Sequence, residues 1–142
     1  MRRRYAVLLL AVLCLASIAG VQGYAVQSRA SEQIRYYNAT ILQNNKGQLD
    51  IGFTIQCTDN MDALGATSIV VQRFNGASWV SEYTFNIRDY PGLQTQHKDH
   101  YSATVLYPLG NPGARYRATV YFYARNSTGL DTAIKTTNSV AT

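Results

Sequence analysis

Strict alternation between apolar and polar residues is the feature that most limits how this chain can fold. Within residues 48–57, every second position is apolar: Leu49, Ile51, Phe53, Ile55 and Cys57. Successive side chains of a β-strand point to opposite faces, whereas a helix would scatter these five residues around its circumference. The alternation therefore predicts a half-buried strand with Cys57 in the core. A one-residue slip in register would expose all five side chains.

The same alternation predicts six further strands. Along residues 115–125, core-type residues alternate with polar ones, and three arginines mark the solvent face. The other predicted strands cover residues 35–43, 67–74, 79–87, 101–107 and 132–140. Turn sequences separate several of them, including Asn75-Gly76, which favours a tight hairpin because both residues tolerate positive φ. Seven short strands without an amphipathic helix predict an all-β fold, an antiparallel two-sheet sandwich.

The N-terminal segment has the features of an export signal. Three arginines at positions 2–4 precede an uncharged, mostly apolar run over residues 6–21, and small residues follow near Gly23. This run is shorter than the roughly 20 apolar residues that a membrane-spanning helix needs. We therefore predict a helical signal peptide over residues 1–23, a flexible N-terminal segment over residues 24–34 and a β-sandwich domain over residues 35–142.

Two alternatives exist for the N-terminal segment: a retained anchor helix, and a lipid attached to Cys14. A lipid-attachment site has a small residue before its cysteine, whereas Leu13 precedes Cys14. Cleavage near Gly23 is the prediction, and it implies a secreted, extracellular protein with no membrane association after the signal is removed.

Charge and cysteine content narrow the classes of partner. The 142-residue chain has a formal net charge of +5, of which the three N-terminal arginines contribute three, so the rest of the chain has a net charge of +2. Nucleic-acid binding calls for a clustered basic face, so nucleic acid is not an expected partner. Beyond the signal, Cys57 has no second cysteine with which to form an internal disulfide. A packed core must therefore stabilise the protein, which we expect to be a monomer.

A Pro-Gly turn precedes one of the predicted strands. Pro112-Gly113 is followed three residues after the glycine by Tyr116, which begins the strand. This arrangement resembles the tyrosine corner of immunoglobulin-like and fibronectin type III-like sandwiches, although Gly110 stands where fibronectin modules have a leucine. The resemblance implies a hydrogen bond from the Tyr116 hydroxyl to upstream backbone. Tyr116→Phe would then lower stability by about 0.5–1.5 kcal/mol.

A second resemblance extends over nearly all of the chain after the signal. Residues 61–69, Trp79-Val80, residues 121–126 and residues 129–132 are similar, in order and spacing, to a family of small secreted proteins of Gram-positive bacteria. That family is classed as a domain of unknown function. The resemblance implies a bacterial exported protein and supplies no site residues.

His97 and His100 flank Lys98-Asp99 and are the first candidates for a polar site. Imidazole and carboxylate groups are zinc ligands, but this stretch offers three ligands where a structural zinc takes four. The sequence also lacks the G-x-S-x-G motif of an activated serine. We expect no metal, no cofactor and no catalytic site. Both histidines belong to a long connection over residues 88–100, which also contains Tyr90 and is the first place to look for a recognition loop.

Aromatic residues provide the other candidates. Tyr121 and Tyr123 fall on the predicted outer face of the strand over residues 115–125, and Trp79 follows the Asn-Gly turn. Flat rings with neighbouring polar donors suit sugars or peptides, although exposed tyrosines are also ordinary in strands. The sequence thus predicts a secreted, non-catalytic binding or adhesion module for an extracellular glycan or protein. The alternative is a small secreted inhibitor or an antagonistic, toxin-like protein.

Overall fold

The computed structural model describes residues 33–109 and 111–142. The predicted signal peptide, Cys14 and most of the predicted flexible segment lie outside these residues. The described elements are nine strands and one 3-10 helix: β1 (Ile34–Gln43), β2 (Gln48–Met61), β3 (Ala63–Phe74), β4 (Trp79–Asn86), η2 (Pro91–Leu93), β5 (Gln94–Thr95), β6 (Lys98–Pro108), β7 (Arg115–Asn126), β8 (Gly129–Thr136) and β9 (Val140–Ala141).

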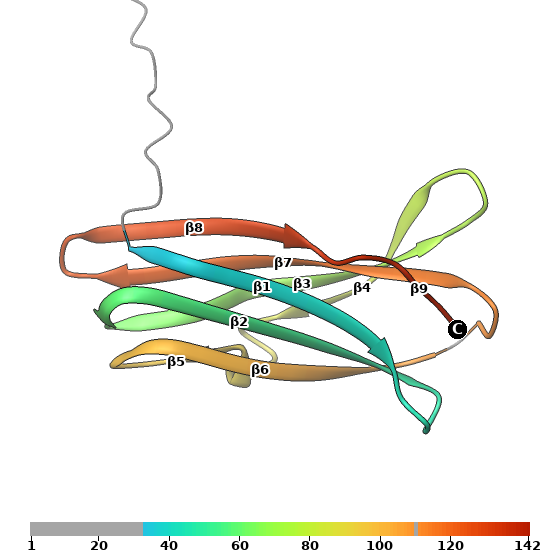
Figure 1. Ribbon diagram of the computed structural model, residues 1–142, viewed down its shortest axis with the longest axis horizontal. Helices are drawn as coiled ribbons and strands as arrows, with labels where there is room; N and C mark the ends of the chain where they lie inside the picture. Colours follow the sequence, from blue (N-terminus) through green and yellow to red (C-terminus); the bar gives the residue numbers. More distant parts are fainter. Residues whose placement is uncertain (1–32, 110) are drawn as a thin grey trace, which may run out of the picture.

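The strands form two antiparallel sheets packed as a sandwich, which confirms the predicted all-β architecture. One sheet has three strands in the order β1-β2-β6. The other has six strands: β4-β3-β7-β8 are neighbours in that order, β5 pairs with β3, and β9 pairs with β7. Figure 1 shows the long strands of both sheets running along the long axis, with the hairpin between β3 and β4 projecting at one end.

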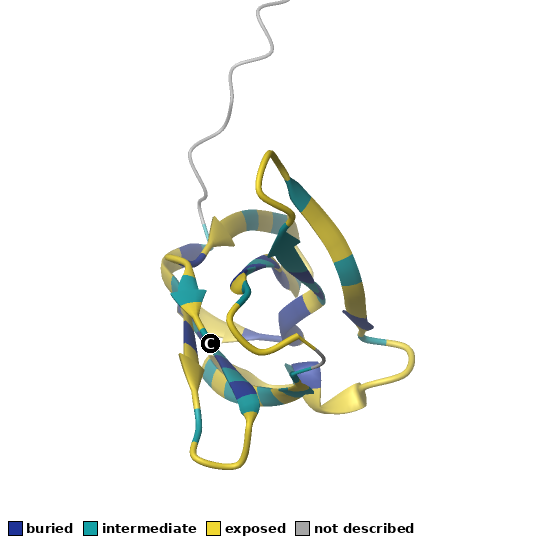
Figure 2. Cartoon of the chain, turned by 90° about the vertical axis from the view of Figure 1, so that its right-hand side faces the viewer, coloured by how far each residue is buried: buried dark blue, intermediate teal, exposed yellow. Residues whose placement is uncertain are grey.

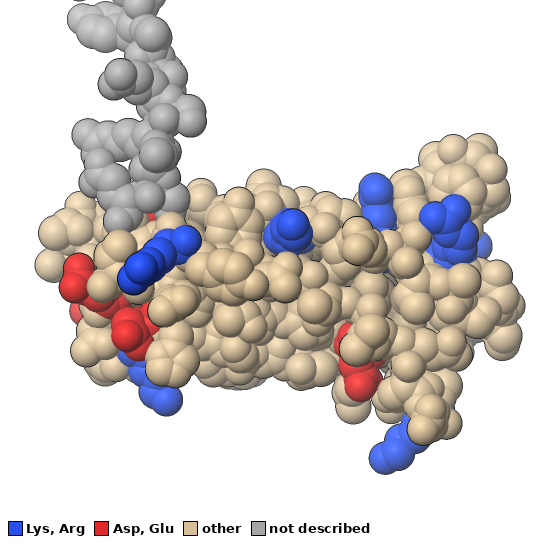
Figure 3. Space-filling model, in the orientation of Figure 1, with Lys and Arg blue, Asp and Glu red and all other residues tan. Residues whose placement is uncertain are grey.

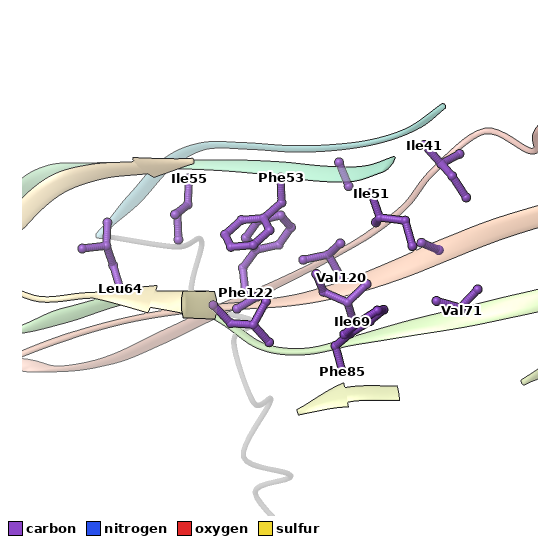
Figure 4. Close-up of a cluster of buried hydrophobic side chains, with 14 of the residues drawn as sticks. Ile41, Ile51, Phe53, Ile55, Leu64, Ile69, Val71, Phe85, Val120 and Phe122 are labelled. Carbon is purple, nitrogen blue, oxygen red and sulfur yellow. The ribbon is translucent and has the colours of Figure 1, made fainter. Parts of the chain in front are cut away.

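The core lies between the sheets, and the alternation along β2 places it as predicted. Leu49, Ile51 and Ile55 are fully buried, and the ring of Phe53 is almost fully buried. Figure 4 shows Phe53 and Ile55 on one layer facing Phe122 and neighbouring side chains of the other. The Phe53 and Phe122 rings meet edge to face, with centroids 6.0 Å apart. Seen end-on, the buried segments surround the interior, and the loops are exposed (Figure 2).

Several predicted strand boundaries are wrong. The strand predicted over residues 67–74 begins at Ala63, and β2 extends to Met61, so a single residue separates two strands that belong to different sheets. The strand predicted over residues 132–140 divides into β8 and β9. It divides at Thr137, whose N–H still donates to the Ala118 carbonyl oxygen at 2.8 Å, because the Ala118 N–H donates to the Thr137 hydroxyl (3.0 Å) in place of the Thr137 carbonyl.

The long connection between β4 and β6 is shorter and better ordered than the sequence predicts. β6 begins at Lys98, so His100 lies in a strand rather than in the connection. Leu93 enters the core, and β5 pairs with the first part of β3. Gly65 of β3 permits this close approach, since a Cβ at this position would lie 2.7 Å from the Gln94 Cα and closer still to the Leu93 carbonyl oxygen.

Tyr116 does not make the hydrogen bond that the tyrosine corner implies. Its side chain is fully buried against Tyr107, with ring centroids 6.3 Å apart. Within the part of the chain that the structure describes, its hydroxyl is buried and has no hydrogen-bond partner. Tyr116 is therefore a core aromatic residue, and the implied hydrogen bond to upstream backbone is wrong.

This environment reverses the expected effect of Tyr116→Phe. Removing a buried hydroxyl that has no partner relieves its desolvation cost and leaves the ring in place. We expect the free energy of unfolding to rise by about 0.5–2 kcal/mol. Urea denaturation of the two proteins measures this difference, and a decrease of similar size would show that the hydroxyl does have a partner.

Cys57 lies on the inner face of β2, as predicted, and is 4% exposed. Burial is the main reason that its pKa rises to about 11, and the charges of Asp131 and Asp99 act in the same direction. A thiol with a raised pKa has little of the reactive thiolate at neutral pH. Cys57 is therefore a structural residue of the core.

Alkylation kinetics test the position of Cys57. With iodoacetamide at pH 8, we expect the folded protein to react at least about tenfold more slowly than the urea-unfolded protein, because the thiol is both buried and protonated. Equal rates in the two states would place Cys57 at the surface and contradict the register of β2.

Candidate functional site

The two long sides of the sandwich differ. On one side β1 packs beside β7 and β8, so the sheets close against each other. On the opposite side β4 and β6 are the edge strands of their respective sheets. Here aromatic side chains connect the sheets: the Tyr83 and Tyr107 rings have centroids 5.9 Å apart. This second side is the open side of the sandwich.

A groove runs along the open side, and we call it the aromatic groove. One hollow of about 380 Å³ is lined by Phe85 of β4, residues 89–93 of the connection and residues 104–106 of β6. An adjoining hollow of about 270 Å³ shares three of these residues and adds Tyr83, Tyr107 and Pro108. The aromatic groove therefore has β6 as one wall, and β4 with the docked connection as the other.

Two tyrosines at the mouth of the aromatic groove support each other. Tyr83 is 40% exposed and Tyr90 is 37% exposed, and their hydroxyl oxygens are hydrogen-bonded at 2.7 Å. Each ring also meets Phe85 edge to face, with centroids 4.9 Å away in both cases. The hydrogen bond is the main cause of a raised pKa at Tyr83. Exposed rings held in this way offer a ligand apolar area at little cost in side-chain entropy.

A polar cluster closes one end of the open side. Glu82 of β4 forms an ion pair with Arg73 of β3. The register between these two strands shifts nearby, between Val71 and Gln72. The Tyr107 hydroxyl donates to the second carboxylate oxygen of Glu82 at 3.1 Å. Burial, followed by this hydrogen bond, raises the pKa of Tyr107 to about 12. The hydrogen bond to Glu82 also raises the pKa of Arg73. The opposite charges of Arg73 and Glu82 offset each other in this ion pair.

The connection predicted as a recognition loop does contribute to the aromatic groove, although it is docked rather than free. Tyr90 lies in the groove as an exposed aromatic residue. The Tyr101 hydroxyl of β6 donates to the Gly92 carbonyl oxygen at 2.7 Å. Together with the buried side chain of Leu93, this bond fixes the wall that Tyr90 and Pro91 form.

The two candidate histidines lie outside the aromatic groove. His97 adopts a left-handed backbone conformation with φ 54°, just before β6. His100 is within β6, and its Nδ1 lies 2.7 Å from the Asp99 carboxylate, which lowers the pKa of Asp99. Across residues 33–109 and 111–142, His, Cys, Asp and Glu side chains do not gather in threes or more in a way that could hold a metal ion.

The two candidate tyrosines of β7 differ in accessibility. Tyr121 is exposed on the outer face of the six-stranded sheet. Tyr123 is only 9% exposed, because the docked connection covers it and its hydroxyl is hydrogen-bonded to the Gln94 amide oxygen. Burial also raises the pKa of Tyr123. The prediction that Tyr123 is exposed beside Tyr121 is therefore wrong.

Trp79 belongs to a separate cluster at the projecting hairpin. The Arg117 guanidinium lies 4.4 Å from the centroid of the Trp79 ring, and the Phe74 ring lies 5.3 Å from it. Arg115 lies over the Phe74 ring at 5.7 Å. Figure 3 shows several basic side chains at this end, while the opposite end has both acidic and basic side chains. Trp79 is half-buried by these contacts and does not line the aromatic groove.

A third surface is a polar hollow of about 300 Å³ over Gly52, on the three-stranded sheet. Hydroxyl groups surround it, and two of them, on Thr54 and Ser102, are hydrogen-bonded to each other at 2.8 Å. A Cβ at Gly52 would lie 2.9 Å from the Thr40 hydroxyl oxygen. Because its residues are small and polar, this hollow offers a ligand less apolar contact than the aromatic groove does.

The sequence alone does not single out several residues of the aromatic groove, notably Tyr83, Leu106 and Tyr107. Alternation predicts their strands but does not reveal that β4 and β6 are facing edges. One signal was available: Val105-Leu106-Tyr107 is a run of three apolar residues that interrupts the alternation. Such a run places an apolar side chain on the outer face, and Leu106 is 52% exposed.

None of the helices in the described part of the chain is long and apolar enough to cross a membrane. Comparison with known proteins gives no match: no family model, no curated protein and no solved structure is significantly similar to this chain. The described residues form a two-sheet antiparallel β-sandwich.

Proposed function

We propose that the protein is a secreted, non-catalytic binding or adhesion module that recognises an extracellular glycan or protein through the aromatic groove. The observation that supports this most is the pair of exposed, mutually hydrogen-bonded tyrosines, Tyr83 and Tyr90, at the mouth of a groove between two edge strands. Rigid aromatic rings with accessible hydroxyls suit both sugars and peptides. The non-catalytic role is consistent with a buried, protonated Cys57 and with histidines that lie outside the groove.

The export, oligomeric state and fold relationship of the module are proposed mainly from the sequence. We propose that the module is exported by a Gram-positive bacterium after cleavage near Gly23, acts as a monomer, and is related to immunoglobulin-like or fibronectin type III-like sandwiches. The basic N-terminal residues followed by an uncharged run support export, and the two-sheet architecture is compatible with such a relationship.

Binding measurements with matched variants test the proposal. The purified exported protein is screened against a glycan array, cell-wall fractions and intact bacterial and host cells. The strongest binder is then titrated with the wild type, with Tyr83→Ala/Tyr90→Ala and with the control Tyr121→Ala. We expect the double variant to lose at least about tenfold in affinity and the control to lose less than about threefold, because a few residues, tyrosines prominent among them, contribute most of the binding energy of an interface.

Two results would overturn the proposal. Binding that is lost in Tyr121→Ala and retained in the groove variant would move the site to the outer sheet face. Growth inhibition of neighbouring cells, with no glycan, wall fraction or cell surface bound, would replace the binding role by the antagonistic, toxin-like alternative.

A further inference from the structure

The free edge of β6 forms one wall of the aromatic groove. In an antiparallel pair, every second residue of a strand exchanges backbone hydrogen bonds with its partner, and the residues between direct their backbone groups to the other side. The Leu109 N–H donates to the Gly47 carbonyl oxygen at 3.2 Å. The register continues without interruption from Gln48–Pro108 to Gln56–His100. The odd-numbered residues of β6 therefore bond to β2, and the N–H and C=O groups of Thr104 and Leu106 point to the open side.

This edge lacks the features that usually prevent a further strand from pairing. Natural edge strands are protected by bulges, internal prolines or charged side chains. The β4 edge has a register shift opposite Val71 and Gln72, and β1 has one near its start. The pairing of β6 with β2 shifts register once, between Lys98 and His100, and is regular from His100 to Pro108. The charged residues Lys98 and Asp99 stand at the start of the strand and the proline at its last position, so the segment from Tyr101 to Tyr107 has neither a bulge, a proline nor a charge.

Space for the side chains of an added strand lies directly beside this edge. Thr104, Val105 and Leu106 line the larger hollow together with Phe85 and Leu93. Alternate side chains of a strand bonded to Thr104 and Leu106 would enter this apolar space, because the side chains of a strand alternate between faces. The remaining side chains would continue the outer face of the three-stranded sheet beside Leu106.

The charge of the aromatic groove indicates which charged side chain an added strand would have. Asp89 is the one charged residue among those that line the two hollows. Among the described residues, the ion pairs are Arg73 with Glu82 and Asp99 with His100, so the Asp89 carboxylate has no cationic partner there. A carboxylate at the mouth of an apolar groove favours a ligand with a lysine or arginine.

From these observations, and resting on the proposed function, we infer that the aromatic groove binds an extended polypeptide segment of another protein as an additional strand on β6, with apolar residues at alternate positions and a basic residue near Asp89. Backbone hydrogen bonds to Thr104 and Leu106 provide affinity, and the pocket lined by Phe85 and Leu93 selects the side chain. This is the β-augmentation mode of peptide recognition.

The test uses nine-residue peptides selected from a random phage-displayed library against the immobilised wild-type protein. The selected peptide is synthesised and titrated with wild type, Thr104→Pro and the matched control Thr104→Val. Proline removes an N–H that does not bond to β2 and blocks strand addition, whereas valine keeps the N–H and the β-branched shape. We expect the affinity for the peptide to fall at least about tenfold in Thr104→Pro, because a backbone hydrogen bond at the edge is lost. In Thr104→Val we expect the affinity to change less than about threefold.

Three further readouts hold even if Thr104→Pro folds poorly. Two versions of the peptide are compared, one N-methylated at its odd-numbered amides and one at its even-numbered amides. Because only one of these sets of amides faces β6, we expect one version to lose binding and the other to bind within about threefold of the unmethylated peptide. Amide exchange at Thr104 and Leu106 of the wild-type protein is expected to slow on binding. Asp89→Asn is expected to weaken binding of a lysine-containing peptide by about threefold to tenfold.

The outcomes separate this inference from the proposed function. A glycan or folded protein that depends on Tyr83 and Tyr90, together with peptides that never bind, retains the proposed function and overturns the added strand. The added strand is also overturned if peptides bind equally well when either set of alternate amides is N-methylated and do not slow amide exchange at Thr104 or Leu106. If no glycan, protein or peptide depends on the aromatic groove, both proposals are wrong.

Discussion

Replacing Phe122 with alanine is expected to lower the free energy of unfolding by about 3–5 kcal/mol, the usual cost of truncating a buried aromatic ring. Phe122 of β7 is 1% exposed. Its ring meets Phe53 of the opposite sheet at 6.0 Å and Tyr37 of β1 at 5.4 Å, so its loss leaves a cavity between the sheets rather than at their rim. Denaturant titration followed by tryptophan fluorescence measures the change.

The control for Phe122→Ala is Ile134→Ala. Ile134 of β8 is also a large apolar residue of the six-stranded sheet, but it is among the exposed ones, and a surface truncation changes stability by about 0.5 kcal/mol or less. If the natural net stability of about 5–15 kcal/mol proves too small for Phe122→Ala to fold, Phe122→Leu provides a milder step. A loss below about 1 kcal/mol in Phe122→Ala would show that the ring does not lie between the sheets.

Replacing Gly65 with alanine is expected to cost about 2–4 kcal/mol, from overpacking together with an unfavourable backbone conformation. Gly65 has φ 149°, and an added Cβ would meet the backbone of Leu93 and Gln94. Backbone cannot rotate away as the end of a flexible side chain can. The docked connection must therefore shift away from β3, and Leu93 must leave its place in the core.

Gly92→Ala is the matched control for Gly65→Ala. Gly92 lies in the same connection, and a Cβ there would have no atom within 4 Å. Its substitution is expected to change the free energy of unfolding by about 0.5 kcal/mol or less. Because Tyr90 and Pro91 form a wall of the aromatic groove, Gly65→Ala is also expected to weaken binding at this site. Equal stability of the two variants would show that the connection does not dock on β3.

The parts of the fold that the sequence predicts are those that depend on local pattern. Alternation along residues 48–57 places Ile51, Phe53 and Ile55 in the core, because a strand with one buried face tolerates a single register. The Asn75-Gly76 turn joins β3 to β4, with Gly76 at φ 99°. Neither inference needs information about distant segments.

The parts that the sequence does not predict depend on contacts between distant segments. Thr137 interrupts the last predicted strand because its hydroxyl finds the backbone of Ala118. Tyr123 is covered because residues 94–95 dock onto β3, which requires a glycine 29 residues earlier at Gly65. The aromatic groove likewise arises from two strands that alternation identifies separately but cannot bring together. Only the order of strands in the sheets shows that β4 and β6 are facing edges.

The aromatic groove and the core also depend on each other. Leu93 is anchored in the core, while its neighbours Tyr90 and Pro91 line the groove, so packing of the core positions the proposed binding surface. The hydroxyl of Tyr101 extends from β6 to the Gly92 carbonyl and fixes the distance between the two walls. The proposed ligand therefore meets a surface that is formed before binding, which lowers the entropic cost of association.

Amide hydrogen exchange along β6, followed by NMR on the free protein, tests most directly the claim that this strand is an open, regular edge beside the aromatic groove. We expect slow exchange at Ala103, Val105 and Tyr107, whose N–H groups bond to β2, and fast exchange at Thr104 and Leu106, which lie between them. Uniformly slow exchange along these five residues would show that another segment already occupies the edge. Uniformly fast exchange would show that β6 does not pair with β2, and either result would contradict the proposed site.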